Sequence, residues 1–174
     1  MRYFIIGQDE TCIDAPKIMN WFDVLDVRKI RRGQSHAIPY RMVLDIQPSE
    51  DTYFTDIVSK PFFLCTEVVK EAVKIYESDI IHKQIMLYDL KNRLSELYFL
   101  PILDIVDCLS DKSELNRDRS VIHRAVLDES RLPDSTIFRL GGVNSTYIVA
   151  RLDLVESILR RGVKGISLKE VEIA

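Results

Sequence analysis

The sequence predicts an α+β fold, with a mostly antiparallel sheet and two or three helices packed on it. Segments with strand character outnumber those with helical spacing, and the two kinds do not alternate regularly, which disfavours a βαβ fold. Of the 174 residues, 47% are hydrophobic and 29% are charged. This composition is typical of a soluble globular domain that buries a sizeable core.

The expected strands combine aromatic and β-branched residues with alternating or continuous apolar character. They span residues 2–6, 53–58, 80–90, 96–103, 121–128, 136–140, 146–150 and 165–173. Gly141-Gly142 predicts a hairpin loop between two of these strands, 136–140 and 146–150. For residues 7–50 the pattern is weaker and predicts only short strands and loops.

Two segments have the apolar spacing of helices. Residues 66–77 carry an apolar stripe at intervals of three and four positions, and Thr66 is a suitable N-cap residue. In the second segment, Asp153 and Glu156 have the Asp-x-x-Glu spacing of a capping box. Gly162 is placed to end that helix in a left-handed conformation.

Charge and cysteine usage narrow the function class. The net charge of −3 disfavours a nucleic-acid-binding protein, which normally carries a basic excess. The basic patch RKIRR (28–32) has no interleaved aromatic residue, so it is interpreted as a solvated or acid-pairing surface. The three cysteines Cys12, Cys65 and Cys108 are widely spaced and predict neither a disulfide framework nor a metal site. With no apolar run of the ~18 residues that a membrane span needs, we expect a cytoplasmic protein without membrane segments.

The stretch SELYFLPILDIVDCLSDKSELNRDRS, residues 95–120, ends a dense apolar run in a string of carboxylates. These are Asp104, Asp107, Asp111, Glu114 and Asp118. Three interpretations are open at this point. The segment is a solvated loop, the rim of a partner-binding surface, or a pair of catalytic acids whose pKa values differ.

A small enzyme is the alternative function. Cys108 and His123, together with one of the aspartates, have the residue types of a nucleophile, a base and an orienting acid. Cys108 follows an apolar run, however, and this placement favours a small buried hydrophobe. A single sequence does not show whether the two side chains meet.

Four stretches of the sequence together resemble a known protein family. They are PFFLCTEVVKEAVKIYE (61–77), YFLPILDIVDCLSDKSELNRDRSVI (98–122), STIFRLGG (135–142) and TYIVARLDLVESILRRGVKGISLKEVE (146–172). In content and order they resemble the eleventh family of bacterial polymorphic-toxin immunity proteins, formerly a domain of unknown function. The resemblance covers residues 54–174, interpreted as an immunity-protein-like domain. Residues 1–53 are expected to be an N-terminal segment of the same domain.

The resemblance implies a protein that binds and blocks a cognate toxin made by the same cell or its kin. It implies no enzyme activity and no cofactor, and no catalytic residue is carried over. The hypothesis for the acidic segment 104–118 is that it forms part of the toxin-binding surface, because acidic surfaces steer association with basic toxins.

Some of the residues that match the family have a structural interpretation instead. These are Asp104, Asp107, Phe138, Arg139 and Gly165. Asp107 is a candidate to cap a turn, and Arg139 is a candidate to pair with a carboxylate inside the sheet.

Overall fold

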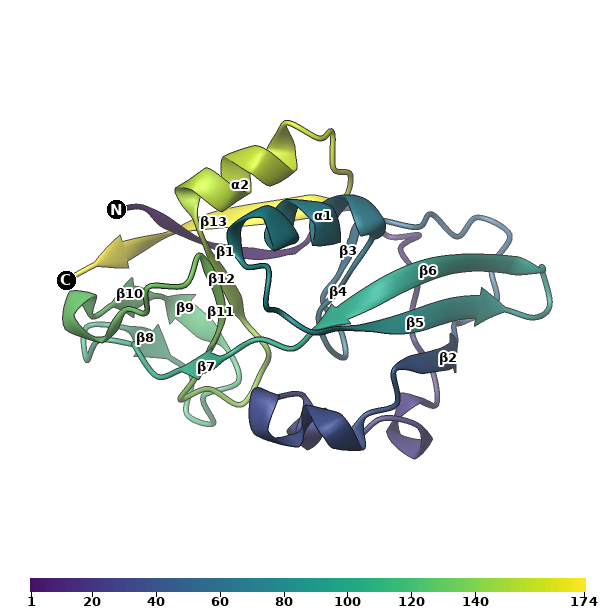
Figure 1. Cartoon of the computed structure of the whole chain (residues 1–174), viewed down its shortest axis with the longest axis horizontal. Coiled ribbons are helices and arrows are strands. Elements are labelled where there is room, and N and C mark those ends of the chain that lie inside the picture. The colour runs from purple at the N-terminus through teal and green to yellow at the C-terminus, as the bar shows by residue number, and fades with distance from the viewer.

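The computed structural model describes residues 1–174 and has an α+β fold built on two sheets (Figure 1). The strands are β1 (Tyr3–Gln8), β2 (Arg41–Asp45), β3 (Ile57–Val58), β4 (Leu64–Cys65), β5 (His82–Asp89), β6 (Leu94–Pro101), β7 (Ile105–Val106), β8 (Glu114–Leu115), β9 (Ile122–Arg124), β10 (Val126–Leu127), β11 (Ile137–Leu140), β12 (Ile148–Arg151) and β13 (Ile166–Ile173). One sheet has the order β10-β13-β1-β12-β11-β7 and the other β2-β5-β6-β4-β3. β8 and β9 form a separate two-stranded ribbon.

Both sheets are mixed, which corrects the expectation of a mostly antiparallel sheet. The pairs β2 with β5, β7 with β11 and β10 with β13 run parallel. In each of these pairs one member is the outermost strand of its sheet. Parallel neighbours need a long crossover connection rather than a tight hairpin. The local sequence pattern of a strand does not record the direction of a partner that lies far away in the chain.

Residues 1–53 contribute to both sheets. β1 lies between β12 and β13, and β2 forms one edge of the other sheet. β2 is one of the short strands expected within residues 7–50, whereas the segment between β1 and β2 forms 3-10 helices. These are η1 (Trp21–Asp23), η2 (Val27–Lys29) and η3 (Arg32–Ala37). Leu25, Ile30 and Ile38 of this segment are buried in a cluster with residues of β2, β5 and β6.

The helices α1 (Glu67–Tyr76) and α2 (Leu152–Leu159) contact each other and lie on the same side of the molecule, at the top of Figure 1. Their buried apolar residues are Val69, Ala72 and Val73 in α1 and Leu154, Val155 and Ile158 in α2. All six belong to one core cluster that also holds residues of both sheets. The helix pair therefore packs against residues of both sheets.

The helices form where the sequence predicts them, but neither predicted cap residue makes a capping hydrogen bond with its side chain. Thr66 occupies the N-cap position of α1, yet its hydroxyl donates to the Asp56 carboxylate, at 2.6 Å, instead of capping the helix. α2 follows β12 without a linker, so Arg151 takes the N-cap position and the Asp153 carboxylate binds the Arg151 guanidinium, at 2.7 and 2.9 Å. Gly162 does adopt a φ of 69° after the last turn, as predicted.

Two expected strands do not form continuously over their predicted ranges. The segment 53–58 forms a ladder only over β3, because the backbone N–H of Tyr53 donates to the carbonyl of Asp14 outside the sheet. The segment 121–128 divides at Ala125 into β9 and β10, which pair with β8 and β13 respectively. The two halves of one apolar pattern therefore bond to different partners.

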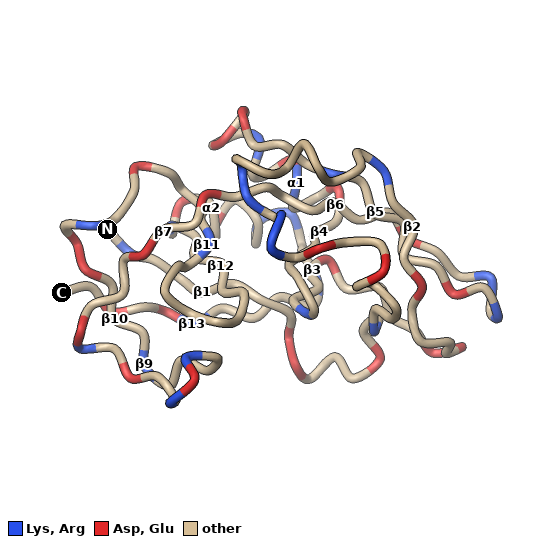
Figure 2. Tube along the Cα trace, turned by 90° about the horizontal axis from the view of Figure 1, so that it is seen from below, with Lys and Arg blue, Asp and Glu red and all other residues tan.

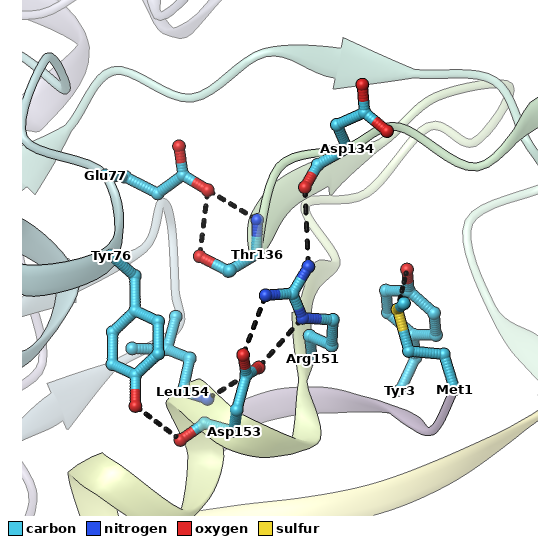
Figure 3. A network of polar contacts seen from close by, with 9 residues as sticks. All are labelled: Met1, Tyr3, Tyr76, Glu77, Asp134, Thr136, Arg151, Asp153 and Leu154. Atoms are coloured by element: carbon cyan, nitrogen blue, oxygen red, sulfur yellow. Dashed lines mark hydrogen bonds and ion pairs between the residues drawn. The ribbon is translucent and has the colours of Figure 1, made fainter.

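A polar network fixes α1 and α2 to the end of β12 (Figure 3). A Glu77 carboxylate oxygen accepts hydrogen bonds from the backbone N–H and the hydroxyl of Thr136, the latter at 2.9 Å. The Tyr76 hydroxyl donates to the carbonyl of Asp153, at 3.1 Å. Because Asp153 also binds Arg151, the two helices share one set of polar contacts. The role of this network is structural, because it holds the two helices against the sheet.

Tyr98→Phe is expected to lower the free energy of unfolding by about 1–2 kcal/mol, because it leaves a buried carbonyl without its donor. Tyr98 is fully buried, and its hydroxyl donates to the carbonyl of Thr55, at 2.6 Å. Urea unfolding measures the loss, and Tyr88→Phe is the control because the hydroxyl of Tyr88, which is not fully buried, makes no hydrogen bond within the chain. Equal unfolding free energies for Tyr98→Phe and the parent protein would contradict this role.

Candidate functional site

The five carboxylates expected to bind a partner have different environments, beginning with Asp104 after β6. The Asp104 carboxylate forms an ion pair with Nε of Arg32, at 3.0 Å. Arg32 also pairs with Asp79, at 3.2 Å. Asp104 is therefore engaged within the chain, and at Arg32 the RKIRR patch is an acid-pairing surface.

Asp107 lies against the hairpin loop between β11 and β12. A Cβ at Gly142, which has a φ of 71°, would lie 2.8 Å from Oδ1 of Asp107. The Asp107 carboxylate accepts no hydrogen bond within the chain, so the suggested capping role is wrong. Arg139 takes part in no ion pair, which also corrects its suggested carboxylate partner, and burial lowers its pKa.

Asp118 holds the turn that joins β8 to β9. Its carboxylate accepts hydrogen bonds from the hydroxyl of Ser120, at 2.7 Å, and from the backbone N–H of Ser120, at 3.2 Å. These hydrogen bonds lower the pKa of Asp118 below its ordinary value, the hydroxyl contributing most. The sequence predicts a role in recognition for Asp118, and the structure shows that it also has a local structural role.

Asp111 and Glu114 remain exposed and take part in no ion pair. Glu114 lies opposite Arg124 in the β8–β9 register. The Arg124 guanidinium, however, makes two hydrogen bonds to Glu172, at 3.0 and 2.5 Å. Asp107 is also exposed and unpaired, so three of the five carboxylates, Asp107, Asp111 and Glu114, are available to a partner.

We define the ribbon lobe as residues 107–124, which comprise β8, β9 and their connecting turns. It lies at one end of the molecule, on the left in Figure 1. Lys112, Arg117 and Arg119 are interleaved with its acidic residues. Blue and red segments accordingly alternate along the trace around β9 (Figure 2). The surface has mixed charge and is not uniformly acidic.

The structure does not bring Cys108 and His123 together as a nucleophile and its base. Cys108 is fully buried, and burial raises the pKa of its thiol to about 11. The reactive thiolate is therefore scarce at neutral pH. His123 is exposed on β9, and no hydrogen bond joins it to Cys108.

A surface hollow of about 600 Å³ lies outside every site that the sequence predicts. We call it the N-terminal pocket. It is lined by Gln8, Glu10, Cys12, Ile13, Ala15, Pro16, Lys17, Ile18, Trp21, Ser59, Lys60 and Pro61. The one signal in the sequence is that the chain's single tryptophan, Trp21, lies in a weakly patterned segment.

Comparison with known proteins does not assign this chain to a family. No protein-family model matches the chain, and no curated protein is significantly similar to it.

Neither α-helix is long and apolar enough to cross a membrane. No group of three or more His, Cys, Asp or Glu side chains is placed to hold a metal ion.

Proposed function

We propose that this protein is a non-catalytic immunity protein that binds and neutralises a cognate bacterial toxin. The observation that carries the proposal is the ribbon lobe, within one of the stretches that resemble the immunity family. There Asp111 and Glu114 are free of ion pairs. The lobe also exposes 45% of Val121. Apolar area beside unpaired charge is the chemistry of a protein-binding surface.

The ribbon lobe is held in one conformation by its own hydrogen bonds. The Asn116 side chain accepts from the backbone N–H of Val121, at 2.9 Å, and donates to the hydroxyl of Ser120, at 3.0 Å. The backbone N–H of Asn116 donates to the carbonyl of Val121, at 3.0 Å. A surface ordered before binding loses less conformational entropy on association. This rigidity suits a stoichiometric inhibitor.

The proposed setting is the cytoplasm, where the toxin would be blocked without a cofactor, a nucleic acid or a membrane. The three cysteines support this setting because all of them are free thiols. Free thiols are typical of proteins that work in a reducing compartment.

Co-purification tests the proposal directly. The tagged protein is recovered gently from its native cell, and its partners are identified by mass spectrometry. The expected result is one stoichiometric protein partner that is lethal when it is expressed alone and harmless when it is expressed with this protein. Recovery of no protein partner, or of one whose toxicity this protein leaves unchanged, would overturn the proposal.

Reversing Asp111→Lys and Glu114→Lys together is expected to slow association with the recovered toxin about tenfold at low salt, because like charges would then meet. The difference should shrink as added salt screens the charges. Asp118 is kept because it holds the turn. Glu50→Lys with Asp51→Lys is the matched control, since both carboxylates are exposed in a loop outside the lobe. Surface plasmon resonance measures the rates, and an unchanged rate for the lobe variant would remove the lobe from the interface.

A further inference from the structure

We infer that the N-terminal pocket binds a small organic anion with a flat apolar body. This goes beyond the proposed function and does not depend on it. The pocket lies where the end of β1, the loop that follows it and the turn between β3 and β4 meet. Its volume of about 600 Å³ falls within the roughly 300–1,000 Å³ of small-molecule sites.

An anchored aromatic ring forms part of the apolar lining. Trp21 contacts the ring of Phe62 edge-on, with centroids 6.0 Å apart, and the ring of Phe22, with centroids 5.9 Å apart. Phe62 is only 1% exposed, so it ties the indole to the core. Ile13 and Ile18 also line the pocket. A fixed indole among aliphatic side chains favours a flat apolar ligand.

The charges of the pocket select an anion. Lys17 and Lys60 line it, and neither takes part in an ion pair within the chain. Glu10 is the one acidic residue of the lining, so the lining carries one net positive charge. Two ammonium groups without carboxylate partners are ready donors for a carboxylate or a phosphate group.

Hydrogen bonds hold the walls of the pocket in place. The backbone N–H of Gln8 donates to the hydroxyl of Ser59, at 2.6 Å, and so joins β1 to the β3–β4 turn. The N–H of Ala15 donates to the carbonyl of Cys12, at 3.1 Å, which folds the loop on itself. A preformed pocket keeps the entropic cost of binding low.

The single tryptophan makes the test specific, because its indole N–H gives one resonance in the NMR spectrum of ¹⁵N-labelled protein. The probes are 2-naphthoate, 2-naphthylmethanol and 2-naphthylmethylamine, which share a ring system and differ in charge. Naphthoate is expected to shift the Trp21 resonance saturably and to bind about tenfold more tightly than the alcohol, as expected for a charge-assisted contact. The amine should bind most weakly.

Substitution of the two lysines separates the contribution of charge to the affinity from the contribution of apolar contact in the pocket. Lys17→Met with Lys60→Met should bring the affinities for naphthoate and the alcohol together, while the exposed Lys91→Met control should leave the difference unchanged. The backbone resonances show directly whether each variant folds. A Trp21 resonance that no probe shifts would overturn the pocket, and equal affinities of the parent protein for all three probes would overturn the anion preference.

Cys12 provides a second readout that needs no substitution. It lines the pocket, whereas Cys65 and Cys108 are buried. Saturating 2-naphthoate is expected to slow alkylation of Cys12 by iodoacetamide severalfold. An alkylation rate that naphthoate leaves unchanged would contradict binding in the pocket.

Discussion

Gly165→Ala is expected to lower the free energy of unfolding by about 3 kcal/mol, through backbone strain and a steric clash together. Gly165 has a φ of 70°, and a Cβ there would lie 2.4 Å from Cγ2 and 2.6 Å from Cβ of Thr55. Thr55 is completely buried, so its side chain has no space into which to move. The close approach is needed because the neighbouring Lys164 N–H donates to the Asp56 carboxylate, at 2.7 Å.

The Gly162→Ala variant separates the cost of backbone strain from the cost of the steric clash with Thr55. Gly162 has nearly the same φ, 69°, but a Cβ there would meet nothing within 4 Å. Its replacement should therefore cost only the backbone strain, about 1 kcal/mol. Urea unfolding of both variants measures the difference. Equal losses would show that the contact with Thr55 does not matter.

Acidification from pH 6.5 to pH 4 is expected to destabilise the protein by about 3 kcal/mol through His82 alone. His82 is 7% exposed, and its Nε2 has no hydrogen-bond partner. Burial lowers the pKa of His82 to about 4, and the nearby positive charges of Lys70 and Lys74 add to this, opposed by the carbonyl of Ile80 and by Glu71. The neutral imidazole is therefore the folded form.

The direction of the pH effect follows from the two pKa values. An unfolded chain takes up the proton near the ordinary histidine pKa of 6.5, whereas the folded protein takes it up only near pH 4. Between these values the unfolded state binds more protons, so stability falls as the pH falls, and above pH 6.5 the effect vanishes. The carboxylates with lowered pKa values, such as Asp26 at about 2, also lose their stabilising effect as the pH falls below about 5, so a variant that lacks His82 is needed to isolate the contribution of the histidine.

The measurement is urea unfolding at several pH values between 4 and 7. His82→Gln removes the titrating group and keeps an amide donor for the carbonyl of Ile80, which Nδ1 of His82 contacts at 3.0 Å. This variant should show a much flatter dependence on pH. The exposed His123→Gln is the matched control and should keep the slope of the parent protein. An unchanged slope in His82→Gln would exclude His82 as the cause.

The sequence by itself located most of the elements. The hairpin of β5 and β6, the helix α1 and the strand β13 form where periodicity predicts them. When one face of an element is buried, apolar residues recur every two positions in a strand and every 3.6 positions in a helix. The position of Gly162 at the end of α2 is also predicted from the sequence, since the residue with positive φ beyond a helix end is usually glycine. Each of these signals is local.

The structure decided which partner satisfies each residue. Lys70 lies in α1 on a predicted helix, yet its ammonium is 4.0 Å from the ring centroid of Phe99 on β6, a contact that no spacing indicates. Asp104 pairs with Arg32 from the N-terminal segment, so a carboxylate expected on a binding surface is occupied. Asp118 holds a turn, and Asp111 stays free.

Tertiary structure alone also decided the parallel strand pairs and the N-terminal pocket. The pocket joins Gln8, Trp21 and Lys60, three residues from separate parts of the chain. Local sequence determines whether a residue needs burial, a left-handed φ or a hydrogen-bond partner. Which distant group meets that need depends on how the sheets and helices pack, because the same need can be met by many partners.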